Sequence, residues 1–422
     1  MDPVTLGMAK AFVKRERDSG ILRPAGYLFM PIGDSITYMD AGNLSDNPLL
    51  PVTTAYATGA TSAGMFAWAN AQLGHRLKMA GNGGVPGDTS EQILARLDAL
   101  LDVPSDIVSV HAGANDFAQG WAASRTITAL TTIYNKIRAT GRRLLVCTTM
   151  SRSTMNNPTG YAYLATVNQF IKNYARKTPG VILADISSAM TDPATGTPYN
   201  TGVFYTADGT HPNAIGAQAM GKVIADALRP FYPANDVFSS NNNDPLNYMR
   251  NACNLGTAGT VANGITGTPG TQWGLSGSGG TVDAAVSKVA RTDGLPGEWT
   301  RITLGATNTA NIVASGGVWW DLTGAAGLKP GDVITTAIEV RTSGLTGVSQ
   351  FNGGSYHPNS QALDLKNTWQ QGNGTVKDNT YTLMVEGAVI QPSATYIQAR
   401  VSVQATAGVI DIGRATVFKT PA

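Results

Sequence analysis

The first half of the chain alternates short apolar runs with segments whose apolar residues recur at helical spacing. The runs cover 27–32, 107–110, 144–148 and 181–184, and the helical periods cover 93–101, 127–137, 161–174 and 214–228. Nearly continuous apolar strands are typical of a parallel sheet that is covered on both faces. The pattern therefore predicts one α/β domain over 26–231.

The pattern changes after residue 231. The segment 232–247, YPANDVFSSNNNDPLN, is rich in Pro, Asn, Ser and Asp, which is typical of a linker. Beyond it glycine and threonine abound and long helical periods are missing, whereas short alternating stretches occur at 333–340, 381–385, 396–403 and 409–412. These stretches predict an antiparallel β-sandwich over 248–422. A chain of 422 residues is long enough for two such domains.

The first 25 residues form a leader before the α/β pattern begins. Its apolar residues in MDPVTLGMAKAFVKRERDSG predict a short amphipathic helix. The stretch lacks the uninterrupted apolar run of a secretory signal, and no segment of the chain has the ~20 apolar residues of a membrane span. The sequence thus predicts no membrane span and leaves the compartment open.

Charge and cysteine content exclude some function classes. The net charge is +2 without any run of like charges, so the basic surface that a nucleic-acid binder needs is not predicted. Of the two cysteines, Cys147 follows an apolar run, which favours a buried free thiol over a disulfide with Cys253. No CxxC or HExxH motif occurs, so no metal site is predicted.

A candidate general base stands in DGTHPNA, residues 208–214. Pro212 suits a first helical turn, which puts His211 at or just before a helix start. Asp208, three residues upstream, can orient the imidazole and leave its other nitrogen free to take a proton. The alternative interpretation is a turn-capping aspartate beside an exposed loop histidine.

A candidate nucleophile follows the first apolar strand, where 27–32 run directly into Gly33-Asp34-Ser35. The GxSxG elbow of the α/β-hydrolases is absent from the sequence. Loops at the carboxyl ends of parallel strands form the usual crevice of such sheets, so the Ser35 hydroxyl stands where a reactive group belongs. A plain turn serine that caps the next helix is the alternative.

Two further loops offer donors for a developing oxyanion. Gly87 precedes a helix that we expect to open at Asp88, with Glu91 at capping-box spacing. Asn115 follows the strand at 107–110 and offers a side-chain amide. A flexible glycine loop and a turn asparagine are the alternatives. The conjunction of four loops at one edge of one sheet favours acyl transfer.

These four motifs, in this order, resemble the blocks of the SGNH (GDSL-type) hydrolases. The blocks are Gly33-Asp34-Ser35, then Gly87 in GDTSEQILARL, then Gly113-Ala114-Asn115-Asp116, then Asp208-Gly209-Thr210-His211. The resemblance covers roughly 26–231, and the GDTS stretch is especially similar to that of bacterial thioesterase and esterase members.

The resemblance implies a three-layer α/β/α sandwich with a parallel, flavodoxin-like sheet, and a serine esterase that needs no cofactor and no metal. It implies Ser35 as nucleophile, His211 as base and Asp208 as the partner of the histidine. The oxyanion hole would comprise the amides of Ser35 and Gly87 and the side chain of Asn115. Candidate substrate-binding residues are Asp34, Tyr38 and Trp121, and candidate pocket walls are Phe66, Trp68 and Phe117.

The β-rich half holds five of the seven tryptophans, Trp273, Trp299, Trp319, Trp320 and Trp369. They favour a carbohydrate-binding module or, alternatively, a tryptophan-rich core, with one ring of the adjacent pair 319–320 on each face. Stretches such as LKPGDVITTAIEVRTSG resemble jelly-roll appendages of glycan-active enzymes and of phage tail proteins.

This second resemblance implies an acetyl-ester esterase acting on an acetylated polysaccharide. One alternative is a phage or prophage tail-associated glycan deacetylase or adhesion protein, which would be virion-associated or extracellular and trimeric. Another is a lipase or thioesterase acting on medium-chain acyl esters. The second His-Pro-Asn copy, at His357, has Gly354 where an aspartate would be needed. We expect a surface-loop or sugar-contact histidine there and no catalytic role.

Overall fold

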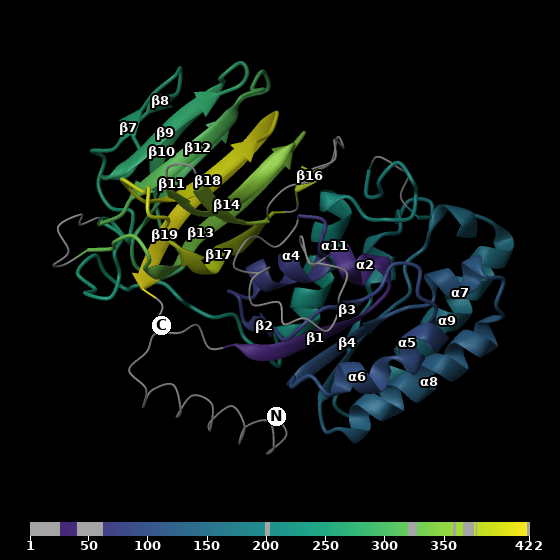
Figure 1. Cartoon of the computed structure of the whole chain (residues 1–422). Coiled ribbons are helices and arrows are strands. Elements are labelled where there is room, and N and C mark those ends of the chain that lie inside the picture. The colour runs from purple at the N-terminus through teal and green to yellow at the C-terminus, as the bar shows by residue number, and fades with distance from the viewer. Residues whose placement is uncertain are drawn as a thin grey trace.

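The structure is a computed structural model that describes residues 26–39, 62–198, 203–319, 327–357, 360–365, 375–376 and 378–419. The helix predicted within the first 25 residues lies outside these ranges. Figure 1 shows an α/β part and a β-rich part side by side.

The α/β part is built on a parallel sheet, as predicted. Its strands are β1 (Tyr27–Gly33), β2 (Leu77–Met79), β3 (Gly83–Gly84), β4 (Ile107–His111), β5 (Arg143–Cys147) and β6 (Val181–Ala184). The order is β2-β1-β4-β5-β6, and β3 pairs with the carboxyl end of β1. All five residues of β4 are buried, which explains the continuous apolar run that predicts a central strand.

Helices cover both faces of this sheet and complete the predicted three-layer sandwich. One layer contains α5 (Ser90–Ala95), α6 (Leu97–Leu101), α8 (Ala123–Ala139) and α9 (Pro158–Lys177), and the other contains α4 (Met65–Gln72), α10 (Ile186–Ala189) and α11 (Ala214–Leu228). Each helix layer forms its own hydrophobic core with one face of the sheet. Successive side chains of β1 point to opposite faces, so Phe29 packs with the second layer and Met30 with the first. Cys147 and Cys253 are both buried and neither forms a disulfide, which confirms the expectation of a buried thiol at Cys147.

The start of α5 differs from the prediction. The N-cap is Thr89, whose hydroxyl accepts from the amide of Gln92 while the Gln92 side chain accepts from the amide of Thr89. The expected pairing of Asp88 with Glu91 is therefore wrong by one residue. Both carboxylates have arginine partners instead, Arg96 for Asp88 and Arg125 for Glu91.

The β-rich part is a sandwich of two sheets, as predicted. The first has the order β16-β13-β19-β11-β10-β8, with β17 also paired to β13, and the second has the order β15-β14-β18-β12-β9-β7. Most pairs are antiparallel, but the short β7 and β8 pair in parallel with β9 and β10. The strands are β7 (Thr260–Val261), β8 (Thr266–Gly267), β9 (Trp273–Ser278), β10 (Ala284–Ala290), β11 (Glu298–Leu304), β12 (Asn311–Gly317), β13 (Val333–Thr346), β14 (Gln350–His357), β15 (Ser360–Asp364), β16 (Thr375–Val376), β17 (Asn379–Val389), β18 (Gln398–Gln404) and β19 (Ala407–Lys419).

The tryptophans of this part divide between core and surface. Trp273 and Trp299 are 1% exposed and belong to the core, whereas Trp319 is 55% exposed. Trp320 and Trp369 lie outside the described residues. His357 is 2% exposed at the end of β14, so the expectation of a surface-loop or sugar-contact histidine is wrong. Its strand turns the side chain toward the interior.

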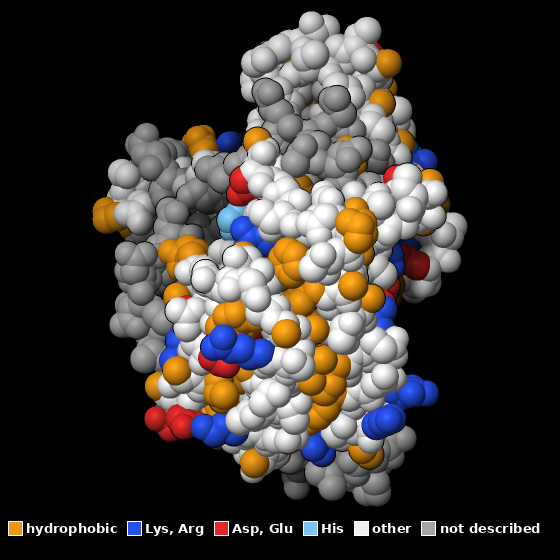
Figure 2. Space-filling model, turned by 90° about the vertical axis from the view of Figure 1, so that its right-hand side faces the viewer, with side chains coloured by type: hydrophobic (Ala, Val, Ile, Leu, Met, Phe, Trp, Pro, Cys, Tyr) orange, Lys and Arg blue, Asp and Glu red, His pale blue; other side chains and the backbone are white. Residues whose placement is uncertain are grey.

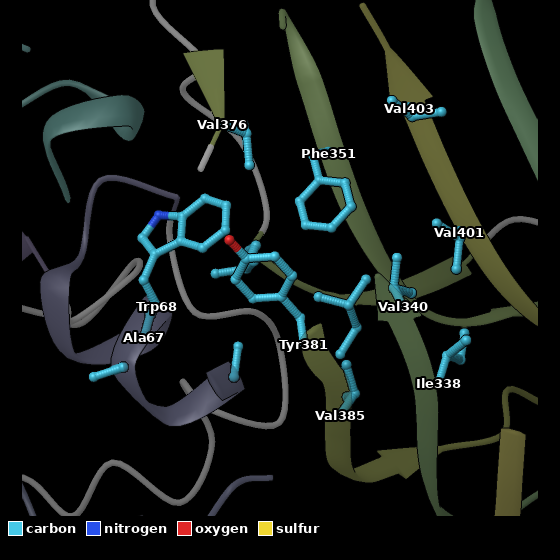
Figure 3. Close-up of a cluster of buried hydrophobic side chains, with 14 of the residues drawn as sticks. Ala67, Trp68, Ile338, Val340, Phe351, Val376, Tyr381, Val385, Val401 and Val403 are labelled. Atoms are coloured by element: carbon cyan, nitrogen blue, oxygen red, sulfur yellow. The ribbon is translucent and has the colours of Figure 1, made fainter. Parts of the chain in front are cut away.

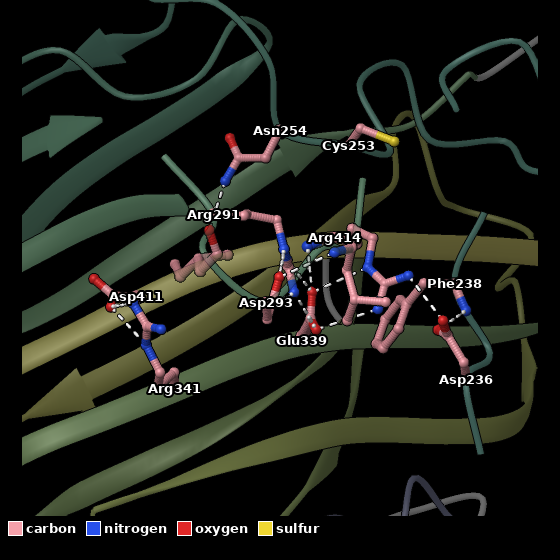
Figure 4. A network of polar contacts seen from close by, with 12 residues as sticks. Asp236, Phe238, Cys253, Asn254, Arg291, Asp293, Glu339, Arg341, Asp411 and Arg414 are labelled. Carbon is pink, nitrogen blue, oxygen red and sulfur yellow. Dashed lines mark hydrogen bonds and ion pairs between the residues drawn. The ribbon is translucent and has the colours of Figure 1, made fainter. Parts of the chain in front are cut away.

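A buried ion network ties the segment 232–247 to the sandwich (Figure 4). Glu339 on β13 binds Arg291 at 2.7 Å and Arg414 at 3.1 Å, and Arg414 also reaches Asp236 at 3.0 Å. Burial raises the pKa of the Glu339 carboxyl, but the two guanidinium groups outweigh it and hold this pKa below its usual value. The network secures the chain at the point where it enters the β-rich part.

The two parts share one hydrophobic core (Figure 3). Trp68 on α4 stacks on Phe351 of β14 with ring centroids 6.0 Å apart, and meets Tyr381 of β17 edge-on at 5.5 Å. Phe66 and Trp68 are fully buried, so the expectation that they line a pocket is wrong.

Polar contacts between the two parts supplement the shared core. The side-chain amide of Gln218 on α11 donates to the Tyr381 hydroxyl at 2.8 Å. The buried His75 ring nitrogen Nε2 lies 2.9 Å from the Asp364 carboxylate and 3.0 Å from the Thr382 carbonyl. The β-rich part is thus docked on the α/β part by apolar and hydrogen-bonded contacts together.

Within the described ranges, no helix has the length and apolar character needed to cross a membrane.

Candidate active site

The Ser35 hydroxyl lies at the carboxyl end of β1, at the first residue of the short helix α2 (Ser35–Tyr38). The Asp34 carboxylate caps this helix by accepting from the amide of Ile36 at 3.0 Å. Gly33 has no room for a side chain, because a Cβ there would lie 2.6 Å from the carbonyl oxygen of His111. Asp34 is 1% exposed, so its carboxylate holds the helix start and does not face a substrate.

The His211 ring joins Ser35 to Asp208. Its Nε2 lies 2.9 Å from the Ser35 hydroxyl, and its Nδ1 lies 2.6 Å from the Asp208 carboxylate. Helix α11 begins at Ala214, with Asn213 as N-cap, so the placement of Pro212 in the first helical turn is wrong. Pro212 instead bridges to Tyr205, and the loop brings His211 back over the sheet edge.

Asp208 is fixed by donors on several sides. One carboxylate oxygen accepts from the backbone amides of Thr210 at 2.8 Å and His211 at 3.0 Å, and from the Thr206 hydroxyl at 2.7 Å. Partial burial raises the pKa of this carboxyl, but the hydrogen bonds from His211, Thr206 and Thr210 outweigh it and lower the pKa far below its usual value. Asp208 therefore stays ionised and orients the imidazole with its Nδ1 protonated.

Gly87 and Asn115 follow β3 and β4, the two strands that pair with the carboxyl end of β1. Gly87 is exposed with φ +85°, a left-handed conformation that favours glycine, and nothing lies within 4 Å of where its Cβ would be. Asn115, on α7 (Ala114–Ala118), donates from Nδ2 to the Asp88 carbonyl at 3.0 Å. Its Oδ1 accepts from Arg152 at 2.9 Å.

The two aromatic residues predicted to bind substrate, Tyr38 and Trp121, are only partly accessible. Tyr38, the last residue of α2, is half-buried. Trp121 is half-buried under Arg125, whose guanidinium lies 3.6 Å from the indole ring. Because Arg125 is also paired with Glu91 at 2.8 Å, one face of the indole is already occupied.

Several polar residues behind the site were missed by the sequence reasoning. Arg96 donates to the Asp88 carboxylate at 2.7 Å and to the Gly33 carbonyl at 3.0 Å. Arg152 holds Asn115, as described above. Asp116 accepts from the Ser90 amide at 3.0 Å and so fixes the start of α5. Asp116 stands in the Gly-Ala-Asn-Asp motif and Arg96 in the GDTSEQILARL stretch, so the sequence offered a signal for both, whereas Arg152 stands in no motif.

The site reaches the surface on the side of the molecule shown in Figure 2, where a histidine (pale blue) lies beside basic side chains. Three of the four histidines are at most 5% exposed, whereas the His211 side chain is 31% exposed. An accessible imidazole with a hydroxyl on one nitrogen and a carboxylate on the other is the arrangement of a nucleophile activated by a base.

Residues 32–219 match the GDSL-like Lipase/Acylhydrolase family. The family that the α/β part matches is one of lipases and acylhydrolases, which supports a carboxylic ester hydrolase. No curated protein sequence matches the chain.

Three solved structures illustrate the likeness. A catalytic mutant of Axe2, an acetylxylan esterase from Geobacillus stearothermophilus, is 17% identical with a TM-score of 0.40, over 51% of this chain and 98% of that one. LAE5, an α/β hydrolase from the metagenome of Lake Arreo, is 22% identical with a TM-score of 0.38, over 50% and 98%. A lipolytic G-D-S-L protein from Veillonella parvula is 17% identical with a TM-score of 0.36, over 47% and 96%.

Proposed function

We propose that Ser35 is the nucleophile of a serine esterase, with His211 as general base and Asp208 as the partner that orients it. The observation that carries the proposal is the unbroken series of contacts from the Ser35 hydroxyl to His211 at 2.9 Å and from His211 to Asp208 at 2.6 Å. These distances are within the range required for proton transfer in a nucleophile–base pair.

The reaction follows from this arrangement in two stages. His211 takes the proton of Ser35 as the hydroxyl attacks the ester carbonyl, and then gives it to the departing alcohol, which leaves an acyl group on Ser35. Water, deprotonated by His211, releases the acid. The backbone amides of Ser35 and Gly87 and the side-chain amide of Asn115 are the donors that we assign to the oxyanion.

The nucleophile is tested by Ser35→Ala with p-nitrophenyl acetate as substrate and with a fluorophosphonate label. We expect turnover to fall by on the order of 10⁴-fold or more and labelling to disappear. Ser153→Ala is the matched control, because its exposed hydroxyl lies next to the loop of Asp208 and belongs to no proton path. Wild-type turnover in Ser35→Ala would refute the assignment.

The substrate that we favour is an acetyl ester on a polysaccharide. On the β-rich part, Tyr396 is 42% exposed, and its ring lies 6.2 Å from that of Tyr356. Arg400 covers the Tyr356 ring at 3.4 Å and bonds Gln398 at 2.7 Å. Aromatic rings beside such donors and acceptors suit the apolar face and the hydroxyl groups of a sugar, which supports the proposal.

This substrate is tested by acetate release from acetylated xylan, compared with hydrolysis of p-nitrophenyl esters of increasing acyl length. We expect Tyr396→Ala to raise KM for the polymer by about tenfold and to leave p-nitrophenyl acetate hydrolysis unchanged. A preference for medium-chain esters without activity on any polymer would instead favour the lipase or thioesterase alternative. A trimer in sedimentation, together with activity on a bacterial surface glycan, would favour the tail-associated deacetylase.

A further inference from the structure

We propose that Arg152 is a positioning residue that fixes the orientation of the Asn115 amide and thereby completes the oxyanion site. The inference rests on the proposed function of Ser35. Arg152 lies in the loop that follows β5 and donates from Nη1 to the Asn115 Oδ1 at 2.9 Å. No sequence motif marks it, and its role follows only from this contact.

An asparagine side chain can present either its oxygen or its nitrogen to a given neighbour, and only the nitrogen can donate to an oxyanion. A guanidinium has donors only, so Arg152 requires the Oδ1 atom on its side. The Asp88 carbonyl, 3.0 Å from Nδ2, requires the nitrogen on the other side. The flipped amide would place donor against donor at Arg152 and acceptor against acceptor at Asp88.

The orientation leaves one N–H of the Asn115 amide for the reaction. Nδ2 carries two hydrogens, and among the described residues only the Asp88 carbonyl accepts from it. Arg152 therefore acts at a distance from the substrate: it selects the amide orientation in which the second hydrogen can be offered to the oxyanion. Donors that are oriented before the reaction are those that lower the barrier.

The same contacts connect the loops that carry the site. Arg96 donates to the Gly33 carbonyl and to the Asp88 carboxylate. The Asp88 carbonyl accepts from the Asn115 amide, whose oxygen in turn accepts from Arg152. The strand end before the nucleophile and the two loops of the oxyanion donors are thus one hydrogen-bonded unit.

The unit extends to the loop of the base. Ser153, the neighbour of Arg152, donates its backbone amide to the Gly209 carbonyl at 2.8 Å. Gly209 stands between Asp208 and His211 in the chain, so the loop after β5 contacts the loops of both the oxyanion donor and the base. A residue at this junction can position Asn115 without contacting the substrate.

Arg152→Met removes the donors and keeps an unbranched apolar side chain, and Arg152→Lys restores one donor. With p-nitrophenyl acetate we expect kcat to fall about 10- to 100-fold in Arg152→Met, less than the 100- to 1000-fold typical of losing an oxyanion donor outright. KM should change less than about threefold, because the ground state does not use the oxyanion donors. Arg152→Lys should recover part of kcat.

Arg142→Met is the matched control. Its guanidinium is also half-buried, but it bonds the carbonyls of Ser105 and Val103 at the opposite, amino-terminal end of β5. We expect its kcat to stay within about twofold of the wild type. Affinity for a tetrahedral boronic acid should fall in parallel with kcat in Arg152→Met and stay unchanged in Arg142→Met, whereas general loosening of the fold would weaken product binding as well.

The decisive measurement is a double-mutant cycle with Asn115→Ala. If Arg152 acts through Asn115, then adding Arg152→Met to Asn115→Ala should lower kcat by less than about threefold. A full additional loss in that background would overturn the inference, because Arg152 would then act on the substrate itself. An unchanged kcat in Arg152→Met, with the wild type active and Ser35 labelled, would also overturn it. A wild type without esterase activity or labelling would instead refute the proposed function.

Discussion

The shared core between the two parts makes Trp68→Ala the most informative stability mutation in the chain. Trp68 is fully buried, contacts Phe351 and Tyr381 of the β-rich part, and donates its indole N–H to the Ser62 carbonyl at 2.8 Å. Removing this side chain leaves a cavity bounded by both parts of the molecule. The substitution should therefore destabilise the α/β sheet and the sandwich together.

The magnitude follows from large-to-small substitutions in protein cores. A buried Trp→Ala change costs about 3–5 kcal/mol, and the Ser62 carbonyl adds to this cost because it loses its donor. We expect about 4 kcal/mol in the free energy of unfolding. Trp319→Ala is the control, because it removes the same side chain from the surface. Trp319 is 55% exposed, and the Arg250 guanidinium lies 4.9 Å from the centre of its ring. It should cost about 0.5–1 kcal/mol.

The assay is urea unfolding followed by circular dichroism and by tryptophan fluorescence. The wild type should unfold in one transition that both probes report, and Trp68→Ala should move that transition to lower urea without splitting it. The reasoning would be refuted by two separate wild-type transitions of which Trp68→Ala moves only one. A cost no larger than that of Trp319→Ala would refute it as well.

Three further predictions concern single sites. Asp208→Asn should lower kcat by on the order of 10⁴-fold, because the amide no longer holds the imidazole in the tautomer that leaves Nε2 free for the Ser35 proton; a kcat within tenfold of the wild type would contradict this. Gly84→Ala should abolish turnover of p-nitrophenyl acetate, because the new Cβ would lie 2.7 Å from the Tyr38 Cα. At Gly87 a new Cβ meets open space, so Gly87→Ala should lower the free energy of unfolding in urea by only about 1 kcal/mol, through backbone strain. Glu339→Gln should cost about 3–5 kcal/mol at neutral pH. Because the pKa of Glu339 is lowered by folding, its stabilisation is complete above the ordinary carboxyl pKa and is lost as the pH falls toward the folded value, so the cost should shrink in acid.

The sequence predicted the sheet where the pattern was local and long enough. Strands β1, β4, β5 and β6 are runs of four to seven mostly apolar residues, of which β4 is buried throughout and the others in large part, and their apolar content marks them directly. Strands β2 and β3 have three and two residues, too few for any period, and exist because they pair with β1. Helix α4 was missed because all of its residues are buried, so it has no polar face to reveal a helical period.

The residues of the candidate site likewise differ in how far the sequence could predict them. Ser35, Asp208 and His211 stand in short motifs next to recognisable elements, so their chemistry could be inferred from neighbours in the chain. Arg152 lies 37 residues from Asn115, and Arg96 lies 63 residues from Gly33, so each contact exists only in the folded chain. An arginine in a helix or loop is ordinarily a solvated charge. No periodicity in the sequence shows that Arg96 and Arg152 instead bond groups of the site.

The β-rich part bears on the active site through helix α11. This helix begins directly after the loop of His211, and most of its residues are buried between the sheet, α4 and the β-rich part. Gln218, on its second turn, is fully buried and bonds Tyr381 of β17. A binding module on a flexible tether would affect only the local concentration of substrate. A domain that packs against the helix after His211 also determines where that helix lies, so the geometry between His211 and Ser35 depends on both parts of the chain.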